Sequence, residues 1–519
     1  MKLSHHLPIF TLFTFLLLLL LLPGKVTARD NNFDVKGFHL DLRIQVMTPK
    51  ALHEFANELA DFGINTLVME WEASFPYQKH AVISNQYAYT REEVEAFISH
   101  CHSLGIDVIP LQQCFGHVEY ILRNERYSHL KEDRKEISQI CPLKTEGDSL
   151  LFTELFEDMA SLHSSQYIHI GGDETYLLGH CADCSRKAAT EGKSKLFVDY
   201  MKMITGIIID MGKTPVMWAD ILLKHPEAAS ELPKETIFID WNYGWKTNYF
   251  GDIGALQKKG LQFWGSPAIR SHPDNWYLTE WEKHFNNQRD FIPYARKAGY
   301  EGMVMTSWST SGLYGFTWDV NYEVMDMLQI RNNYPLSGFR ILIASYAEAL
   351  KQQVPIHPAQ FVEKYASKRF GFTPDQSRRF RESLFTKQEL IREGKPVTSN
   401  SISDLQLETE RARTILYSLS PKTNQKEFEH FRLMIDLRSF YLKFKEIKAI
   451  YNSETFTRDA ARGLLPRIEA LIRYSKELDK RFYELNKGFL YDDEIEAQNE
   501  FRHIDLIQTY QRMVAISKK

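Results

Sequence analysis

Residues 167–174 read Tyr167-Ile168-His169-Ile170-Gly171-Gly172-Asp173-Glu174, a short apolar run that stops at two glycines and two carboxylates. A run of this length that ends at glycines is typical of a buried strand and the turn after it. Seven similar runs occur elsewhere in the chain. The eight predicted strands cover Gly37–Arg43, Thr66–Glu72, Asp107–Gln113, Tyr167–Gly171, Pro215–Ala219, Thr236–Trp241, Gln262–Gly265 and Gly302–Trp308.

Helical periodicity lies between these strands, as over Lys50–Phe62, Arg91–Leu104, Ser149–Ser161 and Lys193–Met211. Eight alternating strands and helices are what a (β/α)₈ TIM barrel requires, although an open, doubly wound sheet fits the alternation too. Polar residues end nearly every predicted strand. This favours the closed barrel, because TIM barrels hold their functional groups at those ends.

The strand signal stops after about residue 346. Three later windows, Ser403–Leu419, Gln425–Tyr451 and Arg458–Leu485, show helical periodicity with dense charge. We therefore predict an α/β chain with a barrel over residues 29–346 and a helical C-terminal domain over residues 347–519.

The N-terminal residues 1–28 have the pattern of a secretory signal peptide. Leu7–Leu22 is nearly all apolar and follows Lys2, and Val26-Thr27-Ala28 offers a cleavage site of small residues. We expect export to the periplasm or the extracellular space, with no membrane span after cleavage.

The composition and charge of the chain indicate which classes of partner to expect. The 519 residues are 44% hydrophobic and 25% charged, which is ordinary for a globular protein. The formal net charge of −4 provides no basic field, so we expect no nucleic-acid partner. The oligomeric state stays open.

The predicted strand ends supply the candidate site residues. They are Asp41, Arg43, Glu70, Glu72, Gln112, Gln113, His117, His169, Asp173, Glu174, Trp218, Asp220, Asp240, Trp241, Tyr243, Trp264 and Trp308. Tryptophans around carboxylates suit a sugar, because its apolar faces stack on indoles while its hydroxyls form hydrogen bonds.

Asp173 and Glu174 are adjacent, which is unusual for a pair of catalytic carboxylates. The two acids of ordinary glycosidases are about 5–5.5 Å or 6.5–9.5 Å apart and usually come from different strands. Adjacent acids instead suit a reaction in which the substrate supplies its own nucleophile: one acid orients that group, and the other protonates the leaving oxygen. The alternative without a catalytic role is a pair of carboxylates that cap the start of a helix.

Residues 167–174 resemble the His-x-Gly-x-Asp-Glu signature of family 20 glycoside hydrolases, the β-N-acetylhexosaminidases. Gly37–Arg43 looks like the first strand of that family, and Gly116-His117 resembles its Gly-His on strand three. Residues 113–120 look more like the hexosaminidase D-like branch than the lysosomal one. Aromatic and polar walls of the family match Trp218, Asp220, Tyr243 and Trp308.

The resemblance implies retaining exo-hydrolysis of terminal β-linked GlcNAc or GalNAc from a glycan, with no cofactor for catalysis. Asp173 would hold the acetamido N–H, and Glu174 would be the general acid and then the base, with a raised pKa. Arg43 would bind ring hydroxyls, and Tyr243 would donate to the acetamido oxygen. The acetamido methyl group would be enclosed by Trp218, Trp241, Trp264 and Trp308. The resemblance also implies that the substrate is bound by His117, His169 and Asp220.

Two positions depart from the family pattern. Gln113 stands where many members have an aspartate four residues before the histidine of strand three. Thr310 stands where many members have an acid two residues after the last tryptophan. We expect Glu70 or Glu72 to substitute in one of these roles.

Cys141, Cys181 and Cys184 form a possible structural zinc site with His180, because three thiolates and one imidazole make a closed tetrahedral set. A disulfide or unpaired thiols are the alternatives, and the odd total of five cysteines excludes complete pairing.

Three other functions stay open beside the exo-glycosidase. They are an endo-acting or disaccharide-releasing glycosidase, a catalytically silent sugar-binding barrel, and a scaffold whose C-terminal helices bind a partner.

Overall fold

The computed structural model describes residues 32–270, 274, 279–310, 315–316, 319–320, 323–324 and 328–518. The predicted signal peptide lies outside the described residues. From Phe33 onward the described chain forms one compact unit. None of the helices in the described ranges is long and apolar enough to cross a lipid bilayer.

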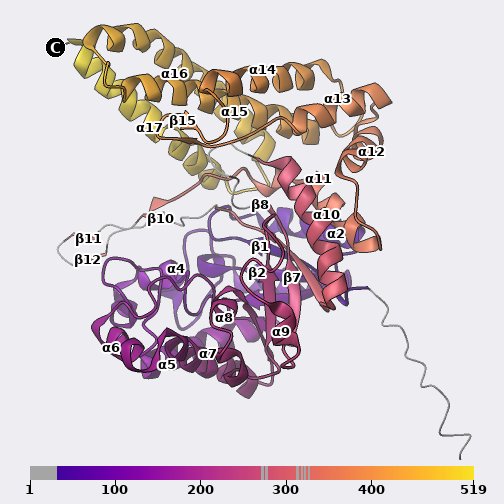
Figure 1. Cartoon of the computed structure of the whole chain (residues 1–519), viewed down its shortest axis with the longest axis vertical. Coiled ribbons are helices and arrows are strands. Elements are labelled where there is room, and N and C mark those ends of the chain that lie inside the picture. The colour runs from indigo at the N-terminus through magenta and orange to yellow at the C-terminus, as the bar shows by residue number, and fades with distance from the viewer. Residues whose placement is uncertain are drawn as a thin grey trace, which may run out of the picture. The chain divides into compact units, whose positions relative to one another are not determined.

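Eight parallel strands close into a barrel, which confirms the predicted TIM-barrel fold (Figure 1). Each strand pairs with the next along the chain, and the last pairs with the first through Val35↔Gly302 and Phe38↔Met305. The strands are β1 (Val35–Asp41), β2 (Thr66–Glu70), β3 (Asp107–Leu111), β4 (Tyr167–His169), β5 (Thr214–Trp218), β6 (Ile237–Trp241), β7 (Gln262–Ser266) and β9 (Gly302–Ser307). A short strand, β8 (Ala268–Arg270), pairs with the end of β9.

Helices connect the strands, and their ends follow from local sequence. The first begins at Pro49 after Thr48, whose hydroxyl accepts from the Ala51 N–H, and it ends at the left-handed Gly63. These helices are α2 (Pro49–Phe62), α3 (Arg91–Ser103), α4 (Glu119–Leu122), α5 (Thr145–Ala160), α6 (Ala182–Glu191), α7 (Lys193–Asp210), α8 (Asp220–Lys224), α9 (Ile253–Gln257), α10 (Trp281–Ala298) and α11 (Arg340–Lys351).

The inside of the barrel is filled by side chains from alternate strand positions, as expected for this fold. The buried members are Val68, Ile109, Leu111, Val216, Trp218, Ile237, Ile239, Trp264 and Val304. The barrel is therefore a packed core, and any binding site must lie at its end.

Six further helices make up most of the described chain from Pro358 onward. They are α12 (Pro358–Phe370), α13 (Pro374–Leu384), α14 (Ile402–Ser418), α15 (Gln425–Tyr451), α16 (Arg458–Asn486) and α17 (Asp492–Lys518). The last four pack in sequence order, each against the next (Figure 1). The described residues also include three antiparallel pairs of two-residue strands: β10 (Gly315–Phe316) with β13 (Leu328–Gln329), β11 (Asp319–Val320) with β12 (Glu323–Val324), and β14 (Ile391–Arg392) with β15 (Lys395–Pro396).

The predicted domain boundary after residue 346 falls inside α11. Tyr346, on that helix, is fully buried, and its hydroxyl lies 3.0 Å from the carbonyl oxygens of both Gly37 and Met303. These two carbonyls belong to the first and last strands of the barrel. The helix that begins the C-terminal part therefore also braces the seam where the barrel closes.

Candidate active site

The acidic pair follows β4 on a tightly constrained turn. Gly171 and Gly172 have φ angles of 66° and 87°, in the left-handed region that glycine tolerates. A Cβ on Gly171 would lie 1.9 Å from Oε1 of Gln113, so the buried Gln113 side chain would have to move to make room for it. Glu174 also has a positive φ, 48°, without being glycine. Strained backbone of this kind is typical of functional sites.

His117, on the loop after β3, joins the two acids. Its Nε2 lies 3.4 Å from Oδ2 of Asp173 and 3.3 Å from Oε2 of Glu174. His117 has a φ of 56°, and a Cβ on Gly116 before it would lie 2.5 Å from the Asp173 carbonyl oxygen. Burial lowers the pKa of His117, but the two carboxylates outweigh it and hold the pKa well above its usual value.

Glu174 is held as a carboxylate in the free protein. Burial raises its pKa, but the hydrogen bond and charge of His117, with the Tyr176 hydroxyl 2.7 Å from Oε1, lower it to about 2. The raised pKa that we predicted from the role of a general acid is therefore wrong for the unliganded protein. The sequence could not show that His117, from the loop after β3, would supply the stabilising charge.

A pocket of about 310 Å³ opens above this pair at the C-terminal end of the barrel. It is lined by Arg43, His117, Asp173, Glu174, Trp218, Trp241, Tyr243, Trp245, Trp308 and Thr310. The volume is at the small end of the range for ligand pockets, about 300–1,000 Å³. Aromatic walls around a polar floor are the arrangement expected for one sugar ring.

The aromatic wall is held together by its own contacts. The Trp308 indole N–H donates to the Tyr243 hydroxyl at 2.9 Å, and the Tyr243 and Trp241 ring centroids are 5.1 Å apart. Three buried polar atoms of the pocket residues have no hydrogen-bond partner within the described ranges: Asp173 Oδ1, Trp218 Nε1 and Trp241 Nε1. Because buried polar atoms are normally paired, these atoms are the natural contacts for a ligand.

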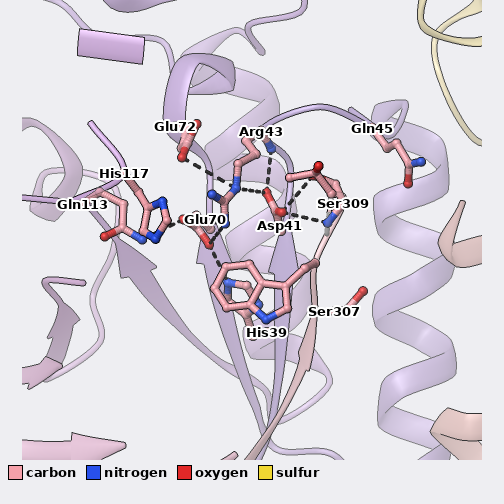
Figure 2. A network of polar contacts seen from close by, with 12 residues as sticks. His39, Asp41, Arg43, Gln45, Glu70, Glu72, Gln113, His117, Ser307 and Ser309 are labelled. Atoms are coloured by element: carbon pink, nitrogen blue, oxygen red, sulfur yellow. Dashed lines mark hydrogen bonds and ion pairs between the residues drawn. The ribbon is translucent and has the colours of Figure 1, made fainter. Parts of the chain in front are cut away.

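Arg43 enters the pocket from a cage of carboxylates (Figure 2). Its guanidinium lies 3.1 Å from Asp41, 3.5 Å from Glu70 and 3.8 Å from Glu72, and it stacks 4.9 Å from the Trp308 ring centroid. Burial raises the pKa of Glu70, but Arg43 and the His39 ring lower it to about 2. All three acids are thus buried around one cation.

Three of the residues that the resemblance implies as substrate-binding lie outside the pocket. The His169 side chain is fully buried against the Trp218 ring, and its Nδ1 accepts from the Gly171 N–H. Asp220 is buried behind the acidic pair, where its Oδ2 accepts from the Glu174 N–H at 3.4 Å. Trp264 pairs in register with Gly302, the first residue of β9, so it lies deep in the barrel core rather than at the strand end.

Sequence reasoning missed three residues at the site. Trp245 lines the pocket, Tyr176 donates to Glu174, and the buried Glu119 lies near His117. All three lie on segments beyond the strand ends, where no sequence periodicity marks an inward direction. Burial raises the pKa of Glu119 to about 7, against the opposing effect of His117.

The two departures from the expected pattern have definite partners. The Gln113 side-chain amide donates to Oε1 of Glu70 at 3.0 Å, so it supports the Arg43 cage rather than His117. Thr310 lines the pocket, and its hydroxyl donates to Asn332 at 3.3 Å. Glu70 and Glu72 both contact Arg43, and neither lines the pocket.

More than half of the chain, residues 47–316, matches the family "Glycosyl hydrolase family 20, catalytic domain". The chain belongs to glycosyl hydrolase family 20. It is therefore a glycoside hydrolase of the β-N-acetylhexosaminidase family, and the last two residues of the signature, Asp173 and Glu174, line the pocket.

Curated relatives of this chain include two hexosaminidases, and a solved structure shares its fold. Hexosaminidase D from Bos taurus is 27% identical over 288 residues, which cover 52% of this chain and 83% of the relative. Hexosaminidase D from Homo sapiens is 27% identical over 293 residues, covering 53% of this chain and 60% of the relative. The structure of Flavobacterium johnsoniae chitobiase shares the fold, with a TM-score of 0.51 and 16% identity over 91% of this chain and 78% of that one.

Proposed function

We propose that this family 20 member removes terminal β-linked GlcNAc or GalNAc from glycans, in an exo-acting, retaining reaction assisted by the 2-acetamido group of the substrate. The observation that carries the proposal is that the adjacent acids Asp173 and Glu174 share one histidine nitrogen at the floor of a small aromatic pocket. No second carboxylate pair lines that pocket in the described residues, so the nucleophile is assigned to the substrate.

Asp173 is the residue that orients the acetamido group and stabilises the positive charge that develops on it. It is 6% exposed, and its Oδ1 has no hydrogen-bond donor in the described part of the protein. A substrate N–H placed there would be held in line while its carbonyl oxygen attacks the anomeric carbon. The carboxylate would then stabilise the positive charge of the oxazolinium ring.

Glu174 is the proton donor, and His117 stores its proton in the free enzyme. One proton shared by His117, Asp173 and Glu174 gives either an imidazolium with two carboxylates or a neutral imidazole with a protonated Glu174. The second form requires only a transfer across the 3.3 Å between Nε2 and Oε2. A substrate N–H at Asp173 would compete with His117 for that carboxylate and favour the second form.

The bond changes follow from these positions. The acetamido oxygen bonds to the anomeric carbon while the bond to the leaving oxygen breaks, and Glu174 gives that oxygen its proton. Water then loses a proton to Glu174 and attacks the same carbon, while the bond between that carbon and the acetamido oxygen breaks. Two inversions leave the β configuration unchanged and return the proton to the enzyme.

The walls support release of one terminal sugar rather than cleavage within a chain. The pocket volume of about 310 Å³ is small, and Arg43 with Trp308 forms one of its walls. The guanidinium fork suits two neighbouring hydroxyls of a single ring. Trp218 and Trp241 provide apolar surface for the acetamido methyl group.

The test compares aryl β-GlcNAc with aryl β-glucoside on the purified chain. Hydrolysis of the first, inert behaviour of the second and inhibition by an N-acetyl thiazoline mimic are expected. Equal turnover of both glycosides contradicts substrate assistance. Binding of GlcNAc without hydrolysis of any aryl glycoside would favour the catalytically silent barrel, which the departures at Gln113 and Thr310 keep as the second candidate.

A further inference from the structure

Four metal-binding side chains converge beside the active-site loop. The sulfur atoms of Cys141, Cys181 and Cys184 and a carboxylate oxygen of Glu132 all lie within 4.8 Å of one another. Glu132 and Cys141 come from the loop after β3. Cys181 and Cys184 come from the segment after β4, where Cys181 caps the start of α6.

The sulfur spacing matches metal coordination and not a disulfide. Cys141 Sγ lies 3.8 Å from Cys181 Sγ and 3.6 Å from Cys184 Sγ. A disulfide needs about 2.05 Å. Two sulfurs on a tetrahedral zinc ion, each bonded at about 2.3 Å, are about 3.8 Å apart. All five cysteines of the chain are free thiols in the structure.

Glu132 is positioned as the fourth ligand by two consecutive backbone N–H groups. Its Oε1 accepts from the N–H groups of His180 at 2.7 Å and Cys181 at 2.8 Å. Its Oε2 is buried and has no hydrogen-bond partner within the described ranges, and the residue is 3% exposed. One oxygen thus fixes the side chain, and the other is left for a ligand.

The loop that carries Glu132 is itself preorganised. The Glu132 N–H donates to the Gln139 carbonyl, and the Cys141 N–H donates to the Leu130 carbonyl. These bonds hold the two ends of residues 132–141 side by side. A metal would therefore meet ligands that are already in place.

His180, the fourth ligand expected from the sequence, does not join the cluster. Its Nε2 lies 3.0 Å from Oδ2 of Asp133, and its side chain is 54% exposed. The Cys-x-x-Cys segment turns into α6 directly after His180, which directs the ring toward solvent. Glu132, 49 residues before Cys181 in the chain, takes the position instead.

We propose that Glu132, Cys141, Cys181 and Cys184 bind one Zn²⁺ ion that joins the loop after β3 to the loop after β4. Three thiolates and one carboxylate complete a tetrahedral set, so no position is left for a catalytic water. The ion is structural, and its charge offsets four anionic ligands gathered in a partly buried place.

The proposed ion would also support the catalytic loop. Gln139, two residues before Cys141, is 1% exposed, and its Oε1 accepts from the Leu177 N–H at 2.9 Å. Leu177 follows Tyr176, whose hydroxyl holds Glu174. This last step rests on the proposed role of Glu174, whereas the metal site does not.

The first experiment is elemental analysis of the full chain purified without chelators. We expect about one zinc per chain, and five thiols by titration after denaturation with a chelator. Replacement by Co²⁺ should give thiolate-to-cobalt absorption. Metal-free protein that does not take up added zinc overturns the proposal, as does a count of three thiols, which would indicate a disulfide.

Variants assign the ligands. C184S should lose the zinc and E132Q should bind it at least about tenfold more weakly. C101S, on α3, and D133N, beside Glu132, should keep it as matched controls. Retention of full zinc by both C184S and E132Q overturns the assignment. If C184S does not fold, the ligand assignment is tested by comparing the rate of zinc release from E132Q with that from the unaltered chain, and equal rates overturn it.

A further measurement separates this proposal from the proposed reaction. Zinc removal should lower the unfolding temperature whether or not the chain hydrolyses a glycoside. If the reaction is also as proposed, removal should lower kcat more than it raises KM, because it loosens the segment that holds Glu174 and not the pocket walls. A zinc-free chain with unchanged stability overturns the structural role.

Discussion

The Nε2 atom of His117 lies 3.3 Å from the Oε2 atom of Glu174, so the residue that would deliver the proton is paired with the residue that holds it. Burial lowers the pKa of His117, but Asp173 and Glu174 raise it well above its usual value, and His117 in turn lowers the pKa of Glu174. The two groups therefore titrate as a unit, and the pH profile of the reaction belongs to the pair.

Replacement of His117 by asparagine should move the alkaline limb of kcat/KM to lower pH. In the unaltered protein the shared proton is retained until pH rises through the raised pKa of His117. In H117N only Glu174 can hold it, so the limb should shift down by at least about one pH unit. Asparagine tolerates the positive φ at this position. The exposed His129 offers a control, and an unchanged limb in H117N contradicts the shared proton.

Substitutions of Asp173 and of Glu174 should differ in which substrates they slow most. E174Q removes the proton donor, which is worth about 10²–10⁴-fold, so a natural disaccharide should suffer more than an activated aryl glycoside. D173N removes the charge that stabilises the oxazolinium and should slow both substrates similarly, by about 10²–10³-fold. The measurement is the ratio of kcat/KM on the disaccharide to kcat/KM on the aryl glycoside, compared between each variant and the unaltered protein. Equal losses in E174Q would assign the proton to another residue.

Arg43 should matter for stability as well as binding. R43A leaves Asp41, Glu70 and Glu72 buried without their shared cation, which should cost about 3–5 kcal/mol in the free energy of unfolding. This differs from a surface arginine, whose loss would leave the fold intact. Urea denaturation measures the effect, and E70Q added to R43A should recover part of it.

The pH dependence of that loss has a definite sign. The pKa of Glu70 is lowered to about 2, so its ion pair contributes stability above its ordinary value of 4.5, and that contribution is lost as pH falls from about 4.5 to about 2. The difference between R43A and the unaltered protein should therefore shrink over this window. A difference that stays constant would show that the carboxylates are stabilised by something other than Arg43.

Two tryptophans provide a matched pair. W308A should raise KM, because Trp308 lines the pocket and contacts Arg43 and Tyr243. W264A should lower the free energy of unfolding by about 3–5 kcal/mol and leave KM unchanged, because Trp264 fills the barrel core. W264F gives the KM if W264A does not fold. A raised KM in W264F would place Trp264 at the substrate after all.

The sequence predicted the barrel well because strand, turn and helix signals are local. The ends of β1, β4 and β5 could be recognised from polar residues after apolar runs. Trp264 was assigned to the site because β7 was predicted to end at Gly265, whereas it continues to Ser266 and its register places Trp264 beside the start of β9. Register between strands is a tertiary property that a single strand does not encode.

The missing parts of the site depend on contacts between distant segments. The lowered pKa of Glu174 arises from His117 on another loop, and Glu132 reaches the cysteine cluster from a stretch without a motif. Tyr176 and Trp245 sit on loops whose path is set by packing. Such residues become visible only when the loops are placed together.

The hydroxyl of Tyr346 lies 3.0 Å from a carbonyl oxygen on each side of the barrel seam, and its helix, α11, directly precedes the C-terminal helices. Heat or denaturant that melts α11 would therefore open the barrel at the same moment. The whole described chain should unfold in one cooperative transition, with the calorimetric and van't Hoff enthalpies in agreement. A protein cut at residue 346 would keep the tyrosine but lose the rest of its helix, so the excised barrel should be far more easily digested by proteases than the intact chain.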